Sequence, residues 1–394
     1  MFGKSLLLAI ALLVSAIDCR SLYPLKAETN DDFVLARTSD ILRSQKRDAN
    51  DDGGVKVFHV NGKEYRAKFQ SKQMSLPVFM LNDAATSEMK SGEHEMYIDL
   101  QNHASFTVSS YTSENGNRVE TIRGNILMDD GELVLEPHHA GEHMAKRDVD
   151  GDGIMTKIYK MSADHILEYK KSRSQFVYDN VHASNEATKV KRQSGPVNNW
   201  VELLTVFDYP FYVYATQRIA STVDQTVANF LTGYACQIIN VANLCYQRSL
   251  TNVTQLKITL YPKYILILKT SSMSSFTTSA AVLRTVNGQS TNSNGRQYLN
   301  GDVALDDFNV WLTRQVVGNN IWSAFDSAVL ITGQDLYSKS GSNLLGLAPL
   351  SGTCTNGTRG MIVEDNFSMD SGLTIAHELA HNLGILSSSS TSLS

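Results

Sequence analysis

Apolar and polar positions alternate along the first half of this chain in short runs separated by turn residues. Residues 55–60 precede Asn61-Gly62, a pair that suits a two-residue hairpin turn because both residues tolerate positive φ. Similar short runs predict further strands over 96–100, 106–111, 119–127 and 133–135. This pattern predicts a small β-rich domain that extends to about residue 178.

The spacing of apolar residues changes in the second half of the chain. Apolar positions three and four residues apart predict a long amphipathic helix over 219–238 and a second helix that begins near Gly301. Short apolar runs predict strands over 201–208, 256–260, 264–268 and 327–332. Because strands alternate with helices, we expect an α/β (α+β) fold here, with a mixed twisted sheet and long helices.

The stretch from Thr374 to Gly384 reads T-I-A-H-E-L-A-H-N-L-G. His377 and His381 are four residues apart, so on a helix both imidazoles lie on one face. They can then bind a single zinc ion at about 2.0–2.1 Å. Glu378 lies next to the first histidine, where it can accept a proton from a zinc-bound water and pass it to a leaving amine. This pattern is the H-E-x-x-H metalloprotease signature.

The residues around this motif suit a helix of the right length. Asp370 and Ser371 offer N-cap oxygens at its start. Gly384 suits its C-terminus, because glycine adopts positive φ without a steric penalty. The alternative is a core helix that carries two histidines and a glutamate by chance. The cap residues and the glycine favour the zinc site.

The extended form of the signature places a third zinc-binding histidine three residues after the glycine. Ser387 holds that position, and a serine hydroxyl is a poor zinc ligand. No later histidine follows it, and the methionine turn that supports such sites is absent. We therefore expect a catalytic domain truncated after the zinc helix, which binds zinc weakly.

Composition limits the class of protein. The 394 residues can hold two domains of ordinary size, and 42% hydrophobic with 19% charged residues is typical of a folded globular protein. The net charge is −5, with no basic stripe along the chain. Nucleic acid is therefore excluded as an expected partner.

Residues 1–16 indicate a secretory signal peptide. Lys4 precedes an apolar run, and Val14-Ser15-Ala16 form a small-residue cleavage pattern. The apolar run is too short to span a bilayer, and no other stretch reaches that length. We expect a product secreted to the extracellular space or matrix, with no membrane span.

The cysteines and sequons fit an extracellular protein. Cys236 and Cys245 are nine residues apart, too far along a continuous helix to form a disulfide. Asn252, Asn356 and Asn366 begin N-x-S/T sequons and are predicted glycosylation sites.

Residues 189–192 read K-V-K-R and lie in a polar linker. A basic cluster is often only a solvated surface. However, the order of signal peptide, non-catalytic domain, basic linker and metal motif is that of a secreted zymogen. We therefore predict cleavage after Arg192 by a furin-type convertase. This divides the chain into a signal peptide (1–16), a prodomain (17–192) and a catalytic domain (193–394).

The C-terminal half resembles the metzincin metalloproteases of the reprolysin branch, closest to the ADAM-TS type. The resemblance lies in V-E-L-L-T-V-F-D (201–208), F-D-S-A-V-L-I-T-G-Q-D-L (325–336), G-L-A-P-L-S-G-T-C (346–354), V-E-D (363–365) and H-E-L-A-H-N-L-G (377–384). Residues 121–127 and 131–137 are similar to the prodomain of the same proteases.

This resemblance implies a metzincin-like catalytic domain preceded by a β-rich prodomain. It implies that His377 and His381 are Zn²⁺ ligands and that Glu378 is the general base. Glu202 and Asp326 fall where such domains place structural Ca²⁺ ligands.

Two functions follow from these observations. The first is a secreted zinc metalloendopeptidase, made as a zymogen, that hydrolyses peptide bonds of extracellular proteins. The second is a weak or inactive truncated product, from a splice form or a partial gene model, that acts as a non-enzymatic decoy or binding protein. The missing third histidine is the feature that separates them.

Overall fold

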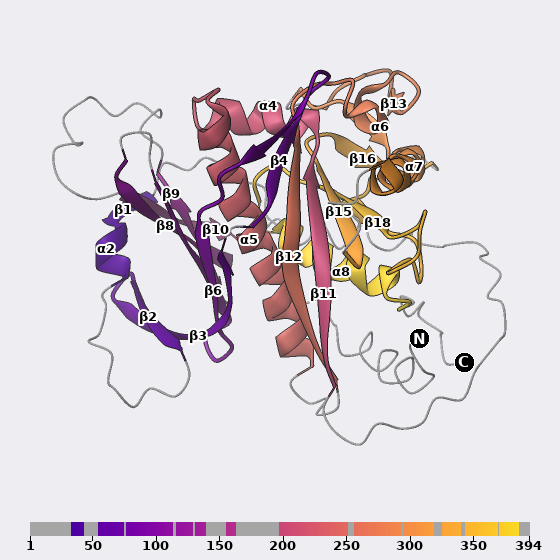
Figure 1. Cartoon of the computed structure of the whole chain (residues 1–394). Coiled ribbons are helices and arrows are strands. Elements are labelled where there is room, and N and C mark those ends of the chain that lie inside the picture. The colour runs from indigo at the N-terminus through magenta and orange to yellow at the C-terminus, as the bar shows by residue number, and fades with distance from the viewer. Residues whose placement is uncertain are drawn as a thin grey trace.

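The computed structural model describes residues 33–42, 54–74, 76–112, 116–128, 131–138, 155–162, 197–250, 256–292, 295–318, 325–339, 343–368 and 370–385. Two large sheets lie on either side of one long helix, α5 (Asp224–Ser249) (Figure 1). The mixed α+β fold expected from the sequence is confirmed.

The first sheet is antiparallel throughout and is formed by the N-terminal part of the chain. Its strand order is β1-β10-β9-β8-β7-β6-β3-β2. The strands are β1 (Phe33–Arg37), β2 (Val55–Val60), β3 (Lys63–Met74), β6 (Glu93–Asp99), β7 (Ala104–Thr112), β8 (Arg118–Met128), β9 (Gly131–Pro137) and β10 (Met155–Ser162). A single turn of helix, α2 (Thr38–Ile41), follows β1. The β-rich N-terminal half and its hairpin at Asn61-Gly62, where φ is 49° and 77°, are confirmed.

The second sheet is mixed, with strand order β17-β18-β15-β11-β12-β4-β5. Its strands are β4 (Val78–Leu81), β5 (Thr86–Met89), β11 (Val197–Phe207), β12 (Leu256–Leu268), β15 (Ser327–Thr332), β17 (Gly346–Leu347) and β18 (Gly360–Glu364). The five inner strands are parallel, whereas β17 and β5 pair antiparallel at the two edges. Strands β4 and β5 come from the N-terminal part of the chain, which the sequence assigns to the prodomain.

Five helices and a small third sheet complete the C-terminal part that the structure describes. The helices are α4 (Tyr209–Arg218), α5, α6 (Ser275–Thr278), α7 (Gly301–Gly318) and α8 (Asp370–Asn382). The third sheet consists of β13 (Leu283–Arg284), β14 (Tyr298–Asn300) and β16 (Asp335–Tyr337), in the order β13-β14-β16.

Two predicted elements differ from those in the structure. The helix expected over 219–238 is α5, which begins at Asp224, because Ile219 caps α4 and Ala220 has a positive φ of 48° that ends that helix. The strands expected over 256–260 and 264–268 are one strand, β12. Pro262, which lacks an N–H, lies where the pairing of β12 with β11 shifts register, so the bulge accommodates it within one strand.

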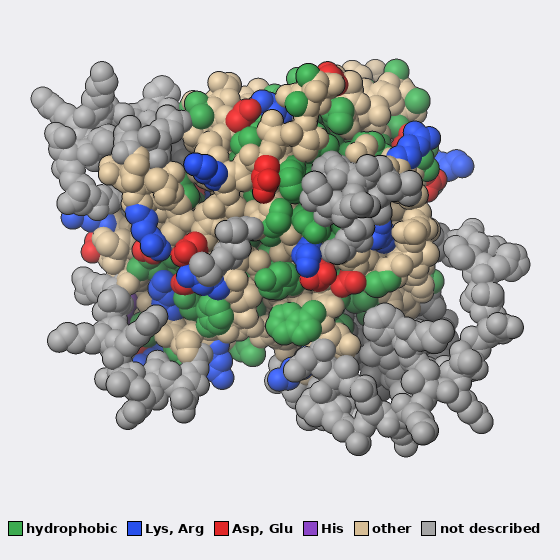
Figure 2. Space-filling model, viewed as in Figure 1, with side chains coloured by type: hydrophobic (Ala, Val, Ile, Leu, Met, Phe, Trp, Pro, Cys, Tyr) green, Lys and Arg blue, Asp and Glu red, His purple; other side chains and the backbone are tan. Residues whose placement is uncertain are grey.

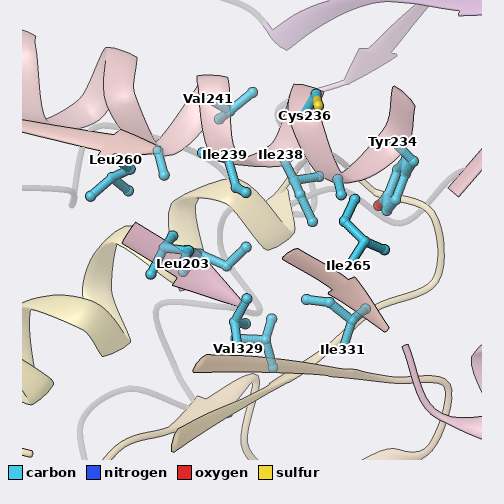
Figure 3. Close-up of a cluster of buried hydrophobic side chains, with 14 of the residues drawn as sticks. Leu203, Tyr234, Cys236, Ile238, Ile239, Val241, Leu260, Ile265, Val329 and Ile331 are labelled. Carbon is cyan, nitrogen blue, oxygen red and sulfur yellow. The ribbon is translucent and has the colours of Figure 1, made fainter. Parts of the chain in front are cut away.

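The core forms on both faces of the second sheet. On one face, α5 and α8 pack against strand residues such as Leu203, Ile265 and Val329, and α5 contributes Ile238 and Ile239 (Figure 3). On the opposite face, α7 packs its buried apolar side chains against β11, β12 and β15. Helix α5 is buried almost throughout its length because its other side faces the first sheet.

On the face seen in Figure 2, the described residues show no concentration of one charge. In the view of Figure 2, Lys and Arg side chains are interspersed with Asp and Glu. None of the helices within the described ranges is long and apolar enough to cross a bilayer.

Candidate metal centre

Helix α8 carries the H-E-x-x-H motif and lies directly against α5. At Gly372 the two helices approach so closely that a Cβ atom there would lie 2.6 Å from the Ile238 carbonyl oxygen. One turn further along, the Tyr246 hydroxyl donates a hydrogen bond of 2.8 Å to the Ala376 carbonyl, next to His377. The position of the first histidine is therefore fixed by α5, which is far away in sequence.

A buried carboxylate organises the loop that leads into α8. Asp365 accepts hydrogen bonds from the Tyr234 hydroxyl, at 2.9 and 2.7 Å, and from the backbone N–H groups of Phe367 and Ser368. Burial raises the pKa of Asp365 to about 6. The predicted N-cap is displaced, because Asp370 is already helical and its N–H donates to the Ser368 hydroxyl.

The glycine after the motif closes the helix with a Schellman motif. Gly384 has a φ of 95°, the Ile385 N–H donates to the Ala380 carbonyl, and the Gly384 N–H donates to the His381 carbonyl. This turn brings the Ile385 carbonyl oxygen to 2.8 Å from His381 Nδ1. A hydrogen bond from Nδ1–H to that oxygen leaves Nε2 as the unprotonated nitrogen, which is the form that binds a metal.

The two imidazoles converge as the sequence spacing predicts. Their Nε2 atoms lie 3.2 Å apart, and the ring planes are nearly perpendicular, at 89°. Two nitrogens bound at about 2.0–2.1 Å in a tetrahedral arrangement would be separated by roughly 3.3 Å. Both histidines are half-buried.

Glu378 is buried beside the edge strand of the second sheet. Its side chain packs over Gly346 in β17, where a Cβ atom would lie 2.7 Å from Glu378 Cγ and 3.1 Å from Glu378 Oε1. The absence of a side chain at Gly346 is therefore what gives the Glu378 carboxylate room. The Glu378 carboxylate therefore lies beside β17, the outermost strand of the second sheet in the described residues. In the sequence it lies between the two histidines.

Gly346→Ala is expected to displace Glu378. If Glu378 is the general base proposed below, the change should reduce peptidase activity at least about tenfold when both proteins also carry Ser387→His, since small misplacements of a catalytic group are costly. Overpacking should also lower the free energy of unfolding by about 1–3 kcal/mol. Gly360→Ala is the matched control, because Gly360 lies in β18 of the same sheet and its Cβ would crowd Phe308 and Asn309 of α7 rather than Glu378. Urea unfolding and peptidase rates measure both effects; equal activity losses in the two variants would contradict the assigned role of Gly346.

The two residues expected to bind calcium have other partners. Glu202 Oε1 lies 2.7 Å from Lys263 Nζ, and this contact raises the pKa of Lys263. Asp326 Oδ2 accepts from the Glu202 N–H at 2.9 Å. Across the described ranges, no group of three or more His, Cys, Asp or Glu side chains is placed to hold a metal ion. These contacts do not support a calcium site.

Other residues singled out in the sequence are only partly described. Asn356 and Asn366 are exposed. Cys236 and Cys245 are buried in the continuous helix α5 and form no disulfide, as the spacing predicts. Residues 1–16, Arg192, Asn252 and Ser387 lie outside the described residues.

Several residues that shape the site were not found from the sequence. Gly346 and Asp365 were noted only as letters of the motifs that carry the resemblance, and Gly372 was not singled out. Tyr246 lies beyond residue 238, where the predicted helix ends. Each of these residues contacts a residue that is distant in sequence. The Tyr246 hydroxyl, for example, donates a hydrogen bond to the Ala376 carbonyl, 130 positions away. A glycine inside a buried strand or helix was the one available signal, since it often marks a close approach of another backbone or side chain.

Residues 297–392 match the family model "Reprolysin (M12B) family zinc metalloprotease". The matched segment contains both histidines and Glu378. The findings support a reprolysin-type zinc metalloprotease, a family whose zinc requirement agrees with the two converging imidazoles.

Curated relatives agree with this match. The human protein "A disintegrin and metalloproteinase with thrombospondin motifs 6" is 36% identical over 94 residues, which are 21% of this chain and 8% of that protein. The mouse protein "A disintegrin and metalloproteinase with thrombospondin motifs 19" is 38% identical over 65 residues, 16% of this chain and 5% of that protein. The aligned part thus spans less than a tenth of either relative.

Solved structures share only a limited likeness with this chain. Metalloproteinase-II from Bacteroides fragilis is 11% identical, with a TM-score of 0.34 over 83% of this chain and 79% of that one. Archaemetzincin from Methanopyrus kandleri is 12% identical, with a TM-score of 0.21 over 47% and 74% of the two chains.

Proposed function

We propose that this chain is a secreted zinc metalloendopeptidase, made as a zymogen, that hydrolyses peptide bonds of extracellular proteins. The observation that carries the proposal is the pair of Nε2 atoms 3.2 Å apart on α8, with Glu378 between the two histidines in sequence. The family match of residues 297–392 supports the same chemistry.

His377 and His381 would hold the zinc ion. Their separation fits two ligands of one tetrahedral ion, and the Ile385 carbonyl keeps His381 in the tautomer that binds metal. When bound, zinc would lower the pKa of a water molecule to about 7 and polarise the scissile carbonyl. The residue expected at the third ligand position is Ser387, whose hydroxyl binds zinc poorly.

Glu378 would act as the general base. It would accept a proton from the attacking water and deliver that proton to the leaving amine nitrogen. Strand β17, on which Glu378 packs, is an outermost strand of the second sheet. An extended peptide could pair with such an edge and place its scissile bond next to this carboxylate.

Zinc retention tests this assignment. After dialysis, the unmodified chain is expected to hold less than one zinc per molecule by metal analysis. Ser387→His should raise the zinc affinity, because it supplies a third direct ligand, and adding His381→Ala should remove that gain. Ser389→His, in the same segment but off the ligand spacing, is the control. One tightly held zinc per unmodified chain would show that another group supplies the third ligand.

The zymogen part of the proposal rests on the basic residues 189–192. Replacing Lys191 and Arg192 by alanine is expected to prevent the backbone cut between the two parts of the chain during secretion. Gel analysis of the secreted protein, with Lys46 and Arg47 replaced as the control, measures this. A wild-type chain that is secreted uncut contradicts activation at Arg192. Secreted protein without peptidase activity, even with Ser387→His, would favour the non-enzymatic alternative.

A further inference from the structure

A short segment of the N-terminal part is built into the C-terminal sheet. Strand β4 pairs in parallel with β12, from Val78 opposite Ile265 to Leu81 opposite Leu268. The Ile265 N–H donates to the Pro77 carbonyl at 3.0 Å, and the Lys269 N–H donates to the Leu81 carbonyl at 2.8 Å. Without β4, strand β12 would be an open edge.

The side chains of β4 belong to the core on both faces of this sheet. Val78 and Met80 lie in the cluster that includes Ile265, under α5. Phe79 and Leu81 lie in the cluster on the opposite face, with Leu266 and Leu268. All four side chains of β4 are at most 6% exposed, as expected for an interior strand of a parallel sheet rather than for a docked surface loop.

The first sheet also forms direct hydrogen bonds with α5. The Asn240 amide donates to the carbonyls of Tyr97 and Phe106, at 3.1 and 3.0 Å. The Gln237 amide donates to Asn125 Oδ1 at 2.9 Å. Buried hydrogen bonds form only when donor and acceptor are aligned. These contacts therefore fix the orientation of the first sheet relative to α5.

Two charged contacts extend this interface. The Arg123 guanidinium of β8 is buried and lies 4.6 Å from the centre of the Phe230 ring of α5. Arg218 of α4 donates to both carboxylate oxygens of Glu136, at 2.9 and 2.8 Å. Both bonds come from Arg218 Nη2, and hydrogen bonds between charged groups are stronger than those between neutral groups.

We propose that the N-terminal part stays bound to the C-terminal part as a non-covalent subunit after the chain is cut between residues 163 and 196. A cut in that segment breaks none of the contacts above. Release would open the edge of β12 and expose apolar side chains on both faces of the sheet. The inserted strand and the contacts to α5 both oppose release. This proposal goes beyond the proposed function and requires neither zinc nor catalysis.

The test uses the full chain with residues 189–192 replaced by the site of a sequence-specific protease that cuts nowhere else. After cutting, both fragments are expected to elute together from a size-exclusion column at the volume of the uncut chain. They should separate only in denaturant. Separate elution in native buffer overturns the proposal, whatever the outcome of the zinc experiments.

Hydrogen exchange on the cut chain provides a second readout that needs no core mutation. The Ile265 and Lys269 amides should exchange at the rate seen in the uncut chain. Acceleration of both by more than about tenfold would show that β4 has left its place, which also overturns the proposal.

A variant pair tests whether the inserted strand is the cause. Met80 and Ser87 face each other across β4 and β5, Met80 buried and Ser87 exposed. After cutting, Met80→Asp is expected to release the N-terminal fragment, and Ser87→Asp is expected to retain it. Retention in both variants would overturn the role assigned to β4. If Met80→Asp does not fold, elution and exchange of the unmodified cut chain decide the proposal by themselves.

Discussion

Glu378→Gln is expected to lower the peptidase rate about 10²–10⁴-fold when introduced together with Ser387→His, while zinc content stays the same. Glutamine has nearly the same shape as glutamate and can still pack over Gly346, but it cannot accept the proton of the attacking water. The two histidines are unchanged, so the metal should remain bound. Peptidase assays on casein and metal analysis of the same samples separate the two effects.

Glu88→Gln is the matched control for this experiment. Glu88 is an exposed carboxylate on β5, and its replacement should leave both activity and zinc content unchanged. Two results would reject the assignment of Glu378 as the base. One is full activity in Glu378→Gln, and the other is loss of zinc in step with loss of activity.

Asp208→Ala is expected to lower the free energy of unfolding by roughly 3–5 kcal/mol. Asp208 is fully buried and accepts hydrogen bonds from the Phe211 N–H (2.8 Å), the Thr332 hydroxyl (2.6 Å) and the Gly333 N–H (3.2 Å). It caps α4 and joins the ends of β11 and β15. Alanine would leave three buried donors without this acceptor. Urea unfolding monitored by circular dichroism measures the loss.

Asp208→Asn is the control, because its amide keeps an acceptor for the backbone donors and can donate to the Thr332 hydroxyl. Asp208→Asn should lower the free energy of unfolding clearly less than Asp208→Ala does. Burial raises the pKa of Asp208 to about 6, from an ordinary value of 3.8. The folded state therefore holds the Asp208 proton more tightly than the unfolded state does. The stability that protonated Asp208 contributes is fully present below about pH 3.8 and is lost as the pH rises through about 6.

Between pH 4.5 and pH 7 the wild type should thus lose about 2 kcal/mol relative to Asp208→Asn, because roughly 1 kcal/mol of the effect is already lost at pH 4.5 as the unfolded carboxyl ionises. Unfolding curves of both proteins at the two pH values test this. A constant difference between them would mean that Asp208 is ionised in the folded protein throughout this range. In that case its hydrogen bonds outweigh its burial.

The sequence determined those features of the protein that depend on neighbours within about one helical turn or one hairpin. His377 and His381 converge because a helix places residues four apart on one face, and the helical pattern of α8 is strong. The positive φ values at Asn61-Gly62 and Gly384 follow from residue type alone. The strand at 327–332 and the helix that begins at Gly301 have the bounds that apolar spacing predicts.

Only the tertiary structure decided how these pieces act on one another. Gly346 leaves room for the Glu378 side chain, and the Tyr246 hydroxyl donates to the Ala376 carbonyl. Val78 pairs with Ile265 of β12. No local sequence pattern indicates any of these contacts, because the partners are far apart in the chain. The order of strands in the second sheet likewise places residues 78–81 beside a strand that begins at Leu256. The physical reason is that helix and turn geometry is set by backbone torsions and short-range hydrogen bonds, which residue spacing reveals. Long-range contacts instead depend on which apolar faces bury one another, and many pairings of such faces are compatible with the same local pattern.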